Sequence, residues 1–291
     1  MTALGVGLVL HPNARYIELI RHLAPQVDFL EVVPETFWRE RESGELDWSP
    51  WADELERLRD QWDLPLVAHG LGFSPGTAGG AEHDRRWLAQ LGRDCARFGY
   101  PWYTEHLGWS SFAGRELFLP LPLPPTEEAV RKVADRLGMI RPFVPVVGFE
   151  NQVGYFNALE GEREPVLWNR ICAAGDLVML LDLHNAWTQC VNFDMDLDRY
   201  VDAIDLARVV EVHLSGGADS EPGWLVTGRT MRLDSHDGPV PEPVWDAFAR
   251  LRPRLPALRG VVVERLDDGF GPDDARLLGE ELERARRIFE R

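Results

Sequence analysis

Eight short apolar runs, each followed by a stretch with helical spacing, most constrain what this chain can fold into. The runs are nearly continuous and rich in β-branched residues, which is typical of parallel strands covered on both faces. They span residues 4–10, 27–33, 64–69, 102–107, 144–150, 178–183, 209–214 and 260–264. The helical stretches span 15–23, 51–62, 81–98, 127–138, 165–173, 197–206, 241–251 and 273–290. This alternation predicts an α/β fold, a (β/α)8 TIM barrel.

A doubly wound open sheet is the rival fold for such an alternation. That fold normally carries a glycine-rich phosphate loop after an early strand. Here the glycines of G-V-G-L-V-L lie inside the first expected strand, so they make a poor dinucleotide fingerprint. The Pro/Gly-rich patches are short enough to be barrel loops, and we expect residues 1–291 to form a single domain.

The charge of the chain bears on its partners. The formal net charge is −17, from 48 acidic and 31 basic residues. Nucleic-acid-binding proteins normally carry a basic footprint, because neutralising phosphates supplies much of their affinity. We therefore expect no nucleic-acid partner.

Other features of the sequence bear on its location. No apolar run approaches the roughly 20 residues of a membrane helix, so we expect no membrane span. The first residues lack a basic region and lead straight into an expected strand, which argues against a signal peptide. Cys95, Cys172 and Cys190 are widely spaced, which excludes a disulfide framework or a thiolate zinc site. Together these features fit a reducing cytoplasm.

Histidines and carboxylates recur at the ends of the apolar runs. In a TIM barrel, the C-terminal ends of the strands build the active site. Each of these residues alone has a structural explanation, such as a capped helix or an anchored loop. Together they would form a prohibitive cluster of buried charge unless a metal compensated them. The residues expected at this level are His69, His106, Glu150, Asp182, His213 and Glu264.

Four neighbouring residues extend this set. Asp182 and His184 are two positions apart, and residues two apart on a strand face the same side, so we expect both to point inward. Asn185 lies where the strand ends and can turn its amide oxygen inward. Asp234 and His236 lie in a segment that we expect to fold back over the site.

The number and type of these ligands bear on the metal. A single ion takes about three to six protein ligands. The candidate set is larger, so we expect two or three ions bridged by carboxylates. Imidazole and carboxylate suit iron, manganese or zinc, and the residue types alone do not choose among them.

Other polar residues near the runs are expected to play structural roles. Glu31 and Glu35 are interpreted as ion-pair partners. His11, His22 and His83 lie at strand or helix edges without the flanking pattern, so we do not count them as ligands.

In their order along the chain, these motifs resemble those of the multinuclear non-haem iron-dependent oxidative enzymes, the MbnB-like family. The resemblance covers nearly the whole chain. Any one motif would be weak evidence, but the ordered series is specific. The motifs are F-L-E-V-V-P-E, H-G-L-G-F-S, T-E-H-L-G-W, E-N-Q, L-L-D-L-H-N, V-V-E-V-H-L-S-G, D-S-H-D-G-P-V-P-E-P-V-W and V-V-V-E-R.

The resemblance implies a TIM barrel that holds two or three irons, in ferrous and ferric form. It implies that dioxygen is used to modify a ribosomally made precursor peptide at cysteine, or at aspartate or asparagine. It also implies a separate partner protein that binds the leader of the precursor. By motif, the implied ligands are His69 and His106 with Glu150 as a bridge, then Asp182, His213 and Glu264, then Asn185, Asp234 and His236.

Three positions depart from the family pattern. The family often has His where this chain has Val33, and Asn where it has Thr36. In the D-x-N-N segment, the first Asn is replaced by His184. His184 could be a further ligand, a hydrogen-bond donor to a ligand, or a general base. We expect the acid or base role, since the other ligand positions already look complete.

Two other classes of protein fit the same residues. Xylose-isomerase-like and endonuclease-IV-like enzymes also place His, Glu and Asp at strand ends, and they use divalent metals without redox chemistry. The acidity of the chain counts against the nuclease. A non-catalytic metal-binding or peptide-carrier protein is the third interpretation. Metal content and oxygen uptake distinguish the three.

Overall fold

The structure is a computed structural model that describes residues 3–77, 81–112, 115–155, 164–266 and 268–291. Within these ranges, eight parallel strands close into a barrel in the order β1-β12-β11-β10-β9-β6-β5-β2. The expected TIM barrel is therefore confirmed. The strands are β1 (Gly5–Val9), β2 (Phe29–Val32), β5 (Leu66–Gly70), β6 (Tyr103–His106), β9 (Val147–Glu150), β10 (Val178–Asp182), β11 (Val209–Leu214) and β12 (Gly260–Val263).

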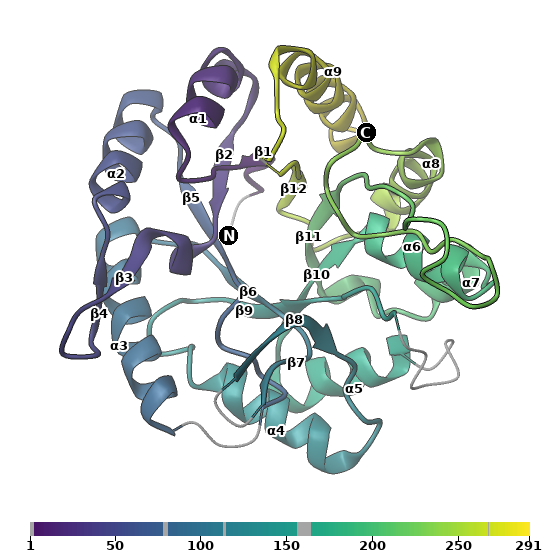
Figure 1. The fold of residues 1–291 in the computed structure, drawn as a ribbon, viewed down its shortest axis with the longest axis horizontal. Coiled ribbons are helices and arrows are strands. Elements are labelled where there is room, and N and C mark those ends of the chain that lie inside the picture. Colours follow the sequence, from purple (N-terminus) through teal and green to yellow (C-terminus); the bar gives the residue numbers. More distant parts are fainter. Residues whose placement is uncertain (1–2, 78–80, 113–114, 156–163, 267) are drawn as a thin grey trace.

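Helices follow the strands and form a ring around the barrel (Figure 1). Several of the longer helices bury one apolar side and carry charged residues on the other. Thr126 illustrates how they begin, because its hydroxyl accepts a hydrogen bond from the Ala129 backbone and caps α4. The helices are α1 (Ala14–Ile20), α2 (Trp51–Trp62), α3 (Ala81–Phe98), α4 (Glu127–Gly138), α5 (Glu164–Gly175), α6 (Leu183–Asn192), α7 (Leu197–Asp202), α8 (Glu242–Leu251) and α9 (Pro272–Phe289).

Aromatic rings fill the barrel near the N-terminal ends of the strands. Phe29 and Trp102 meet edge to face, with ring centroids 5.9 Å apart, and both are fully buried. Gly7 and Gly260 make room for Phe29, since a Cβ at either position would lie within 2.8 Å of that ring. The barrel therefore has a packed apolar floor. Most of the candidate ligands lie toward the C-terminal ends of the strands, away from this floor, whereas Glu211 lies within β11 and hydrogen-bonds to Trp102.

The sixth strand–helix unit differs from the expected one. The predicted strand over 178–183 ends at Asp182, and α6 begins at once with Leu183. The Asp182 carboxylate causes this change, because it accepts a hydrogen bond of 2.7 Å from the Asn185 backbone and caps the new helix. The predicted helix over 197–206 is shorter and corresponds to α7.

Two antiparallel hairpins among the described residues were not predicted. The first joins β3 (Trp38–Glu40) to β4 (Leu46–Trp48), and the second joins β7 (Trp109–Phe112) to β8 (Arg115–Leu121). The described residues contain no helix long and apolar enough to span a membrane.

Candidate metal centre

The nine candidate ligands converge at the C-terminal end of the barrel. Six of them lie at or beside strand ends. His69 lies in β5, His106 ends β6, Glu150 ends β9, Asp182 ends β10, His213 lies in β11, and Glu264 directly follows β12. Ligand atoms of seven of the nine fall into three overlapping groups, in each of which all atoms lie within 4.8 Å of one another. These groups are His69, His106 and Glu150; Glu150, Asp182 and His213; and Asp182, His236 and Glu264. Such groups can hold metal ions.

The first group, here called the strand group, consists of His69, His106 and Glu150. The Nε2 atoms of His69 and His106 lie 3.3 and 3.2 Å from the same oxygen, Oε2 of Glu150. The other nitrogen of each ring, Nδ1, is held by a hydrogen bond. His69 Nδ1 lies 2.9 Å from the Thr104 hydroxyl, and His106 Nδ1 lies 2.9 Å from the Gly70 carbonyl.

The Gly70 carbonyl fixes the tautomer of His106. A carbonyl oxygen only accepts hydrogen bonds, so His106 Nδ1 must carry the proton and donate it. In the neutral ring, Nε2 then presents a lone pair to Glu150 Oε2, which makes no hydrogen bond. Two acceptors that face each other at 3.2 Å are stabilised by a cation or a proton between them.

Glu150 also reaches the centre of the mouth. Its Oε1 lies 3.7 Å from His213 Nδ1, and Glu150, Asp182 and His213 form a second group of possible ligands. Burial raises the pKa of Glu150 to about 7 and, together with the charge of Glu150, raises that of Asp182 to about 8. Glu150 therefore lies where a bridging carboxylate would lie.

The loop group consists of Asp234, His236 and Glu264. Asp234 and His236 belong to the connection between β11 and α8, which folds back over the mouth as expected. His236 Nε2 is 2.6 Å from Asp234 Oδ1, although the two atoms are not aligned for a hydrogen bond. His236 Nδ1 is 3.3 Å from Glu264 Oε1, and its backbone is left-handed, with φ of 51°. The Tyr155 hydroxyl supports the loop by accepting a hydrogen bond from the Asp234 backbone.

The two groups differ in charge. Burial lowers the pKa values of His69 and His106, so their rings are neutral. Burial also opposes protonation of His236, but Asp234 and Glu264 outweigh it and raise the pKa of His236 well above its usual value. The strand group therefore offers neutral imidazoles, whereas the loop group holds an imidazolium between carboxylates.

The structure places His184 differently from the expectation that it would continue the strand. It lies in the first turn of α6 and is fully buried, so the strand alternation that was to point it inward does not apply. Its Nδ1 approaches Asp234 Oδ1 at 3.7 Å, and its Nε2 lies 3.4 Å from the Thr188 hydroxyl. His184 thus contacts the loop group through Asp234.

The side-chain amide oxygen of Asn185 is buried and accepts no hydrogen bond, so it remains available as a ligand. The Nδ2 of Asn185 donates to the Asn151 carbonyl. Asn151 in turn pairs with both backbone polar groups of Asp182 at 2.9 Å. Asn151 therefore fixes the end of β10, from which both Asp182 and Asn185 approach the mouth.

Two buried carboxylates, Glu31 and Glu211, lie beside His213 in the barrel interior, and only Glu31 was singled out in the sequence. Glu31 lies 3.1 Å from His213 Nε2, which confirms its interpretation as an ion-pair partner. Glu211 lies beside Glu31 and was missed. It precedes His213 by two positions in β11, and this spacing alone could have placed it on the same inner face. Glu35 makes no ion pair among the described residues; it accepts hydrogen bonds from the Leu71, Gly72 and Trp87 N–H groups.

The residues present fit a metal cluster of the expected type. Buried oxygens of Glu150, Asp182 and Asn185 have no hydrogen-bond donor, and such oxygens are costly unless a cation or proton meets them. The donor set contains imidazole nitrogens, carboxylates and an amide, and no thiolate. This set suits iron, manganese or zinc.

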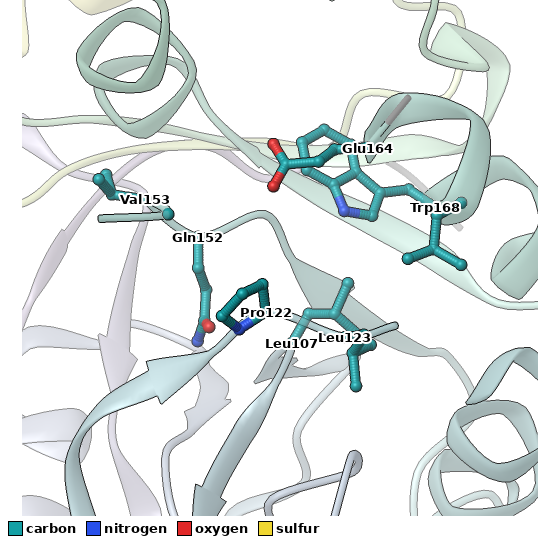
Figure 2. A pocket seen from close by; sticks show the side chains of 9 residues that line it. Leu107, Pro122, Leu123, Gln152, Val153, Glu164 and Trp168 are labelled. Atoms are coloured by element: carbon teal, nitrogen blue, oxygen red, sulfur yellow. The ribbon is translucent and has the colours of Figure 1, made fainter. Parts of the chain in front are cut away.

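A small cavity of about 40 Å³ lies between α5 and the residues that follow β6 and β9 (Figure 2). Its wall includes Leu107, which follows His106, and Gln152, which lies two residues after Glu150. On the other side, Glu164 and Trp168 come from α5. None of the candidate ligands lines this cavity, which has room for little more than a water molecule, so the chemistry is not located there.

Comparisons with known proteins identify relatives along the whole chain. A family model described as "RiPP precursor modification enzyme MbnB/TglH/ChrH" matches residues 4–290. A UPF0276 protein of Caulobacter vibrioides is 28% identical over 285 residues, which cover 97% of this chain and 94% of the relative. A UPF0276 protein of Anaeromyxobacter sp. strain Fw109-5 is 30% identical over 291 residues, covering 98% and 91%.

Solved structures share the fold at low sequence identity. Endonuclease IV of Thermus thermophilus has a TM-score of 0.55 and 19% identity, with 98% of each chain covered. A xylose isomerase domain protein of Planctomyces limnophilus has a TM-score of 0.60 and 12% identity, with 98% of this chain and 97% of the other covered. At such identities the likeness extends to the barrel and carries no information on the reaction.

Proposed function

Because this chain belongs to the MbnB/TglH/ChrH family of RiPP precursor modification enzymes, we propose that it oxidises a precursor peptide with iron and dioxygen. The convergence of three overlapping ligand groups at the barrel mouth is the observation that carries this proposal. This ligand set is large enough for two or three ions. The family match supports peptide modification over a hydrolase or isomerase reaction on the same barrel. The modified residue is proposed to be cysteine, or else aspartate or asparagine.

The ligand assignment follows from the groups. His69 and His106 would hold one iron with Glu150, and Glu150 would bridge it to a second iron held by Asp182, His213 and Glu264. Asn185, Asp234 and His236 would complete a third position. When bound, iron would supply oxygen binding and the redox chemistry of the reaction.

The chain's own residues would bind and orient the peptide. The side chains of His106 and Asp234 are 26% and 24% exposed, whereas His69, Glu150 and His213 are almost fully buried. The peptide would therefore approach from the side of His106 and Asp234. The loop that carries Asp234 and His236 would limit the access of water to the buried carboxylates. A separate leader-binding protein is proposed to deliver the precursor.

Metal analysis and peptide mass spectrometry together test this proposal. After anaerobic purification from iron-supplemented cells, we expect two to three irons per chain. Addition of dioxygen and the precursor peptide encoded beside this protein should consume oxygen and change the mass of the peptide. Tight binding of at most one zinc, which iron cannot replace, together with no oxygen uptake, would contradict the proposal and favour the non-redox barrel enzymes.

A further inference from the structure

The imidazole of His213 lies between two sets of carboxylates. Its Nδ1 faces the mouth, 3.1 Å from Glu264 Oε2 and 3.7 Å from Glu150 Oε1. Its Nε2 faces the barrel interior, 3.1 Å from both oxygens of Glu31. His213 and Glu31 are fully buried, so water cannot replace either contact.

A ring in this place can bind a metal through only one nitrogen while the other carries a proton. His213 belongs to two groups of possible ligands, one with Glu150 and Asp182 and one with Glu31 and Glu211. Glu150 lies on the Nδ1 side and also belongs to the strand group, so we place the metal on that side. If Nδ1 binds the metal, Nε2 must carry the proton and needs an acceptor. Glu31 is that acceptor at hydrogen-bond distance, and carboxylates in this position orient a metal-binding histidine and raise its basicity.

Glu211 has a different environment from Glu31. Its Oε2 accepts a hydrogen bond of 2.7 Å from Trp102 Nε1, and its Oε1 has no donor. Carboxylate oxygens of Glu211 and Glu31 lie within 4.8 Å of each other, and both residues are fully buried. Substitution of either residue removes one buried carboxylate from the same region, so variants of the two can be compared directly. Of the two, only Glu31 hydrogen-bonds to the His213 ring.

We propose that Glu31 is a positioning residue that holds His213 with Nε2 protonated and Nδ1 turned toward the metal centre. This inference rests on the proposed metal centre. Glu31 is not a ligand and touches no substrate. Its effect is exerted through the ring of His213.

A metal titration of two isosteric variants tests the proposal. Zn²⁺ alone, in competition with a chelator, serves as the probe for the full-length wild type, Glu31→Gln and Glu211→Gln. We expect Glu31→Gln to weaken the ion bound at Asp182 and His213 by roughly 10- to 100-fold. Glu211→Gln should bind as the wild type does, because glutamine keeps an acceptor for Trp102 and offers an N–H to Glu31. The ion at the strand group should be unaffected in both.

Nitrogen-15 NMR of histidine in the Zn²⁺-loaded wild type tests the tautomer directly, and the signal of His213 is assigned by its loss in His213→Gln. We expect a protonated Nε2 and a metal-bound Nδ1. This measurement does not depend on whether Glu31→Gln folds. A protonated Nδ1 with a metal-bound Nε2 would overturn the proposal.

The titration separates the failure of this inference from that of the metal centre. Equal weakening in Glu31→Gln and Glu211→Gln would mean that only the buried charge matters, and unchanged affinity in Glu31→Gln would mean that His213 needs no such partner. Either result overturns the role of Glu31 and leaves the centre intact. If neither Zn²⁺ nor Fe²⁺ binds to the wild type, the proposed centre fails and this inference fails with it.

Discussion

The strand group and the loop group offer similar ligands on different supports. His69, His106 and Glu150 all belong to neighbouring barrel strands, and their rings are held by a hydroxyl and a carbonyl. Asp234 and His236 come from the connection between β11 and α8, and His236 has a left-handed backbone. The strand group is therefore fixed by the fold itself, whereas the loop group depends on the loop remaining in place.

The two groups also differ in what a metal must displace. Neutral His69 and His106 can bind a cation without losing a proton, so in the strand group only Glu150, with its pKa raised to about 7, has a proton to release. His213 and His236 have raised pKa values, because nearby carboxylates outweigh the effect of burial. A metal at the loop group must displace the proton of His236. We therefore expect the strand group to load first and the loop group to load more readily as the pH rises.

The largest effect should come from Glu150→Ala, because Glu150 belongs to both the strand group and the central group. Its loss removes negative charge from both positions and should release at least one ion, with affinity reduced by more than roughly 100-fold. Elemental analysis after gel filtration measures this. Glu35→Ala is the matched control, since Glu35 is a nearby carboxylate outside the ligand groups. Full iron occupancy in Glu150→Ala would show that the bridge is assigned wrongly.

The apoprotein should lose stability as the pH rises from about 6.5 to 8. Glu150 and Asp182 have folded pKa values raised to about 7 and about 8, so over this range the folded state binds more protons than the unfolded state. The raised pKa values of His213 and His236 act in the same direction. Each such proton contributes about 1.4 kcal/mol per pH unit, so the total is a few kcal/mol.

Thermal unfolding at several pH values measures this loss of stability. His236→Gln should reduce the slope, whereas His106→Gln should not. The lowered pKa of His106 means that its unfolded state binds more protons, an effect of opposite sign that fades as the pH rises above about 6.5. The metal-loaded protein should not show the decline, since its ligands are already deprotonated. A flat curve for the apoprotein would contradict the assigned charges.

The smallest effect should come from His184→Asn, which introduces the residue that the resemblance to the family implies at this position. His184 is fully buried and meets the loop group only through Asp234. We expect unchanged iron content and a roughly tenfold fall in peptide turnover with an altered pH profile. Both quantities are measured on one sample. Loss of iron would instead identify His184 as a ligand, and wild-type values for both would make it a packing residue.

The sequence-based interpretation succeeded where local pattern and strand ends decide the outcome. The barrel followed from eight apolar runs, and the six strand-end residues converge because parallel strands end at the same edge. It failed at His184, because the side-chain cap that starts α6 at Leu183 cannot be told from two more strand residues by spacing alone. Glu211 was missed although its spacing from His213 was visible, since it lies within its strand rather than at the end.

The sequence by itself determined the fold and the chemical type of the ligands. Periodicity and residue type are local properties, so they can be recognised in the sequence without knowledge of the three-dimensional structure. Only the tertiary structure decided which candidate ligands lie close together, which histidine rings are neutral, and that Glu31 lies against His213. These properties depend on distances between residues up to 182 positions apart and on burial, and both exist only once the barrel closes.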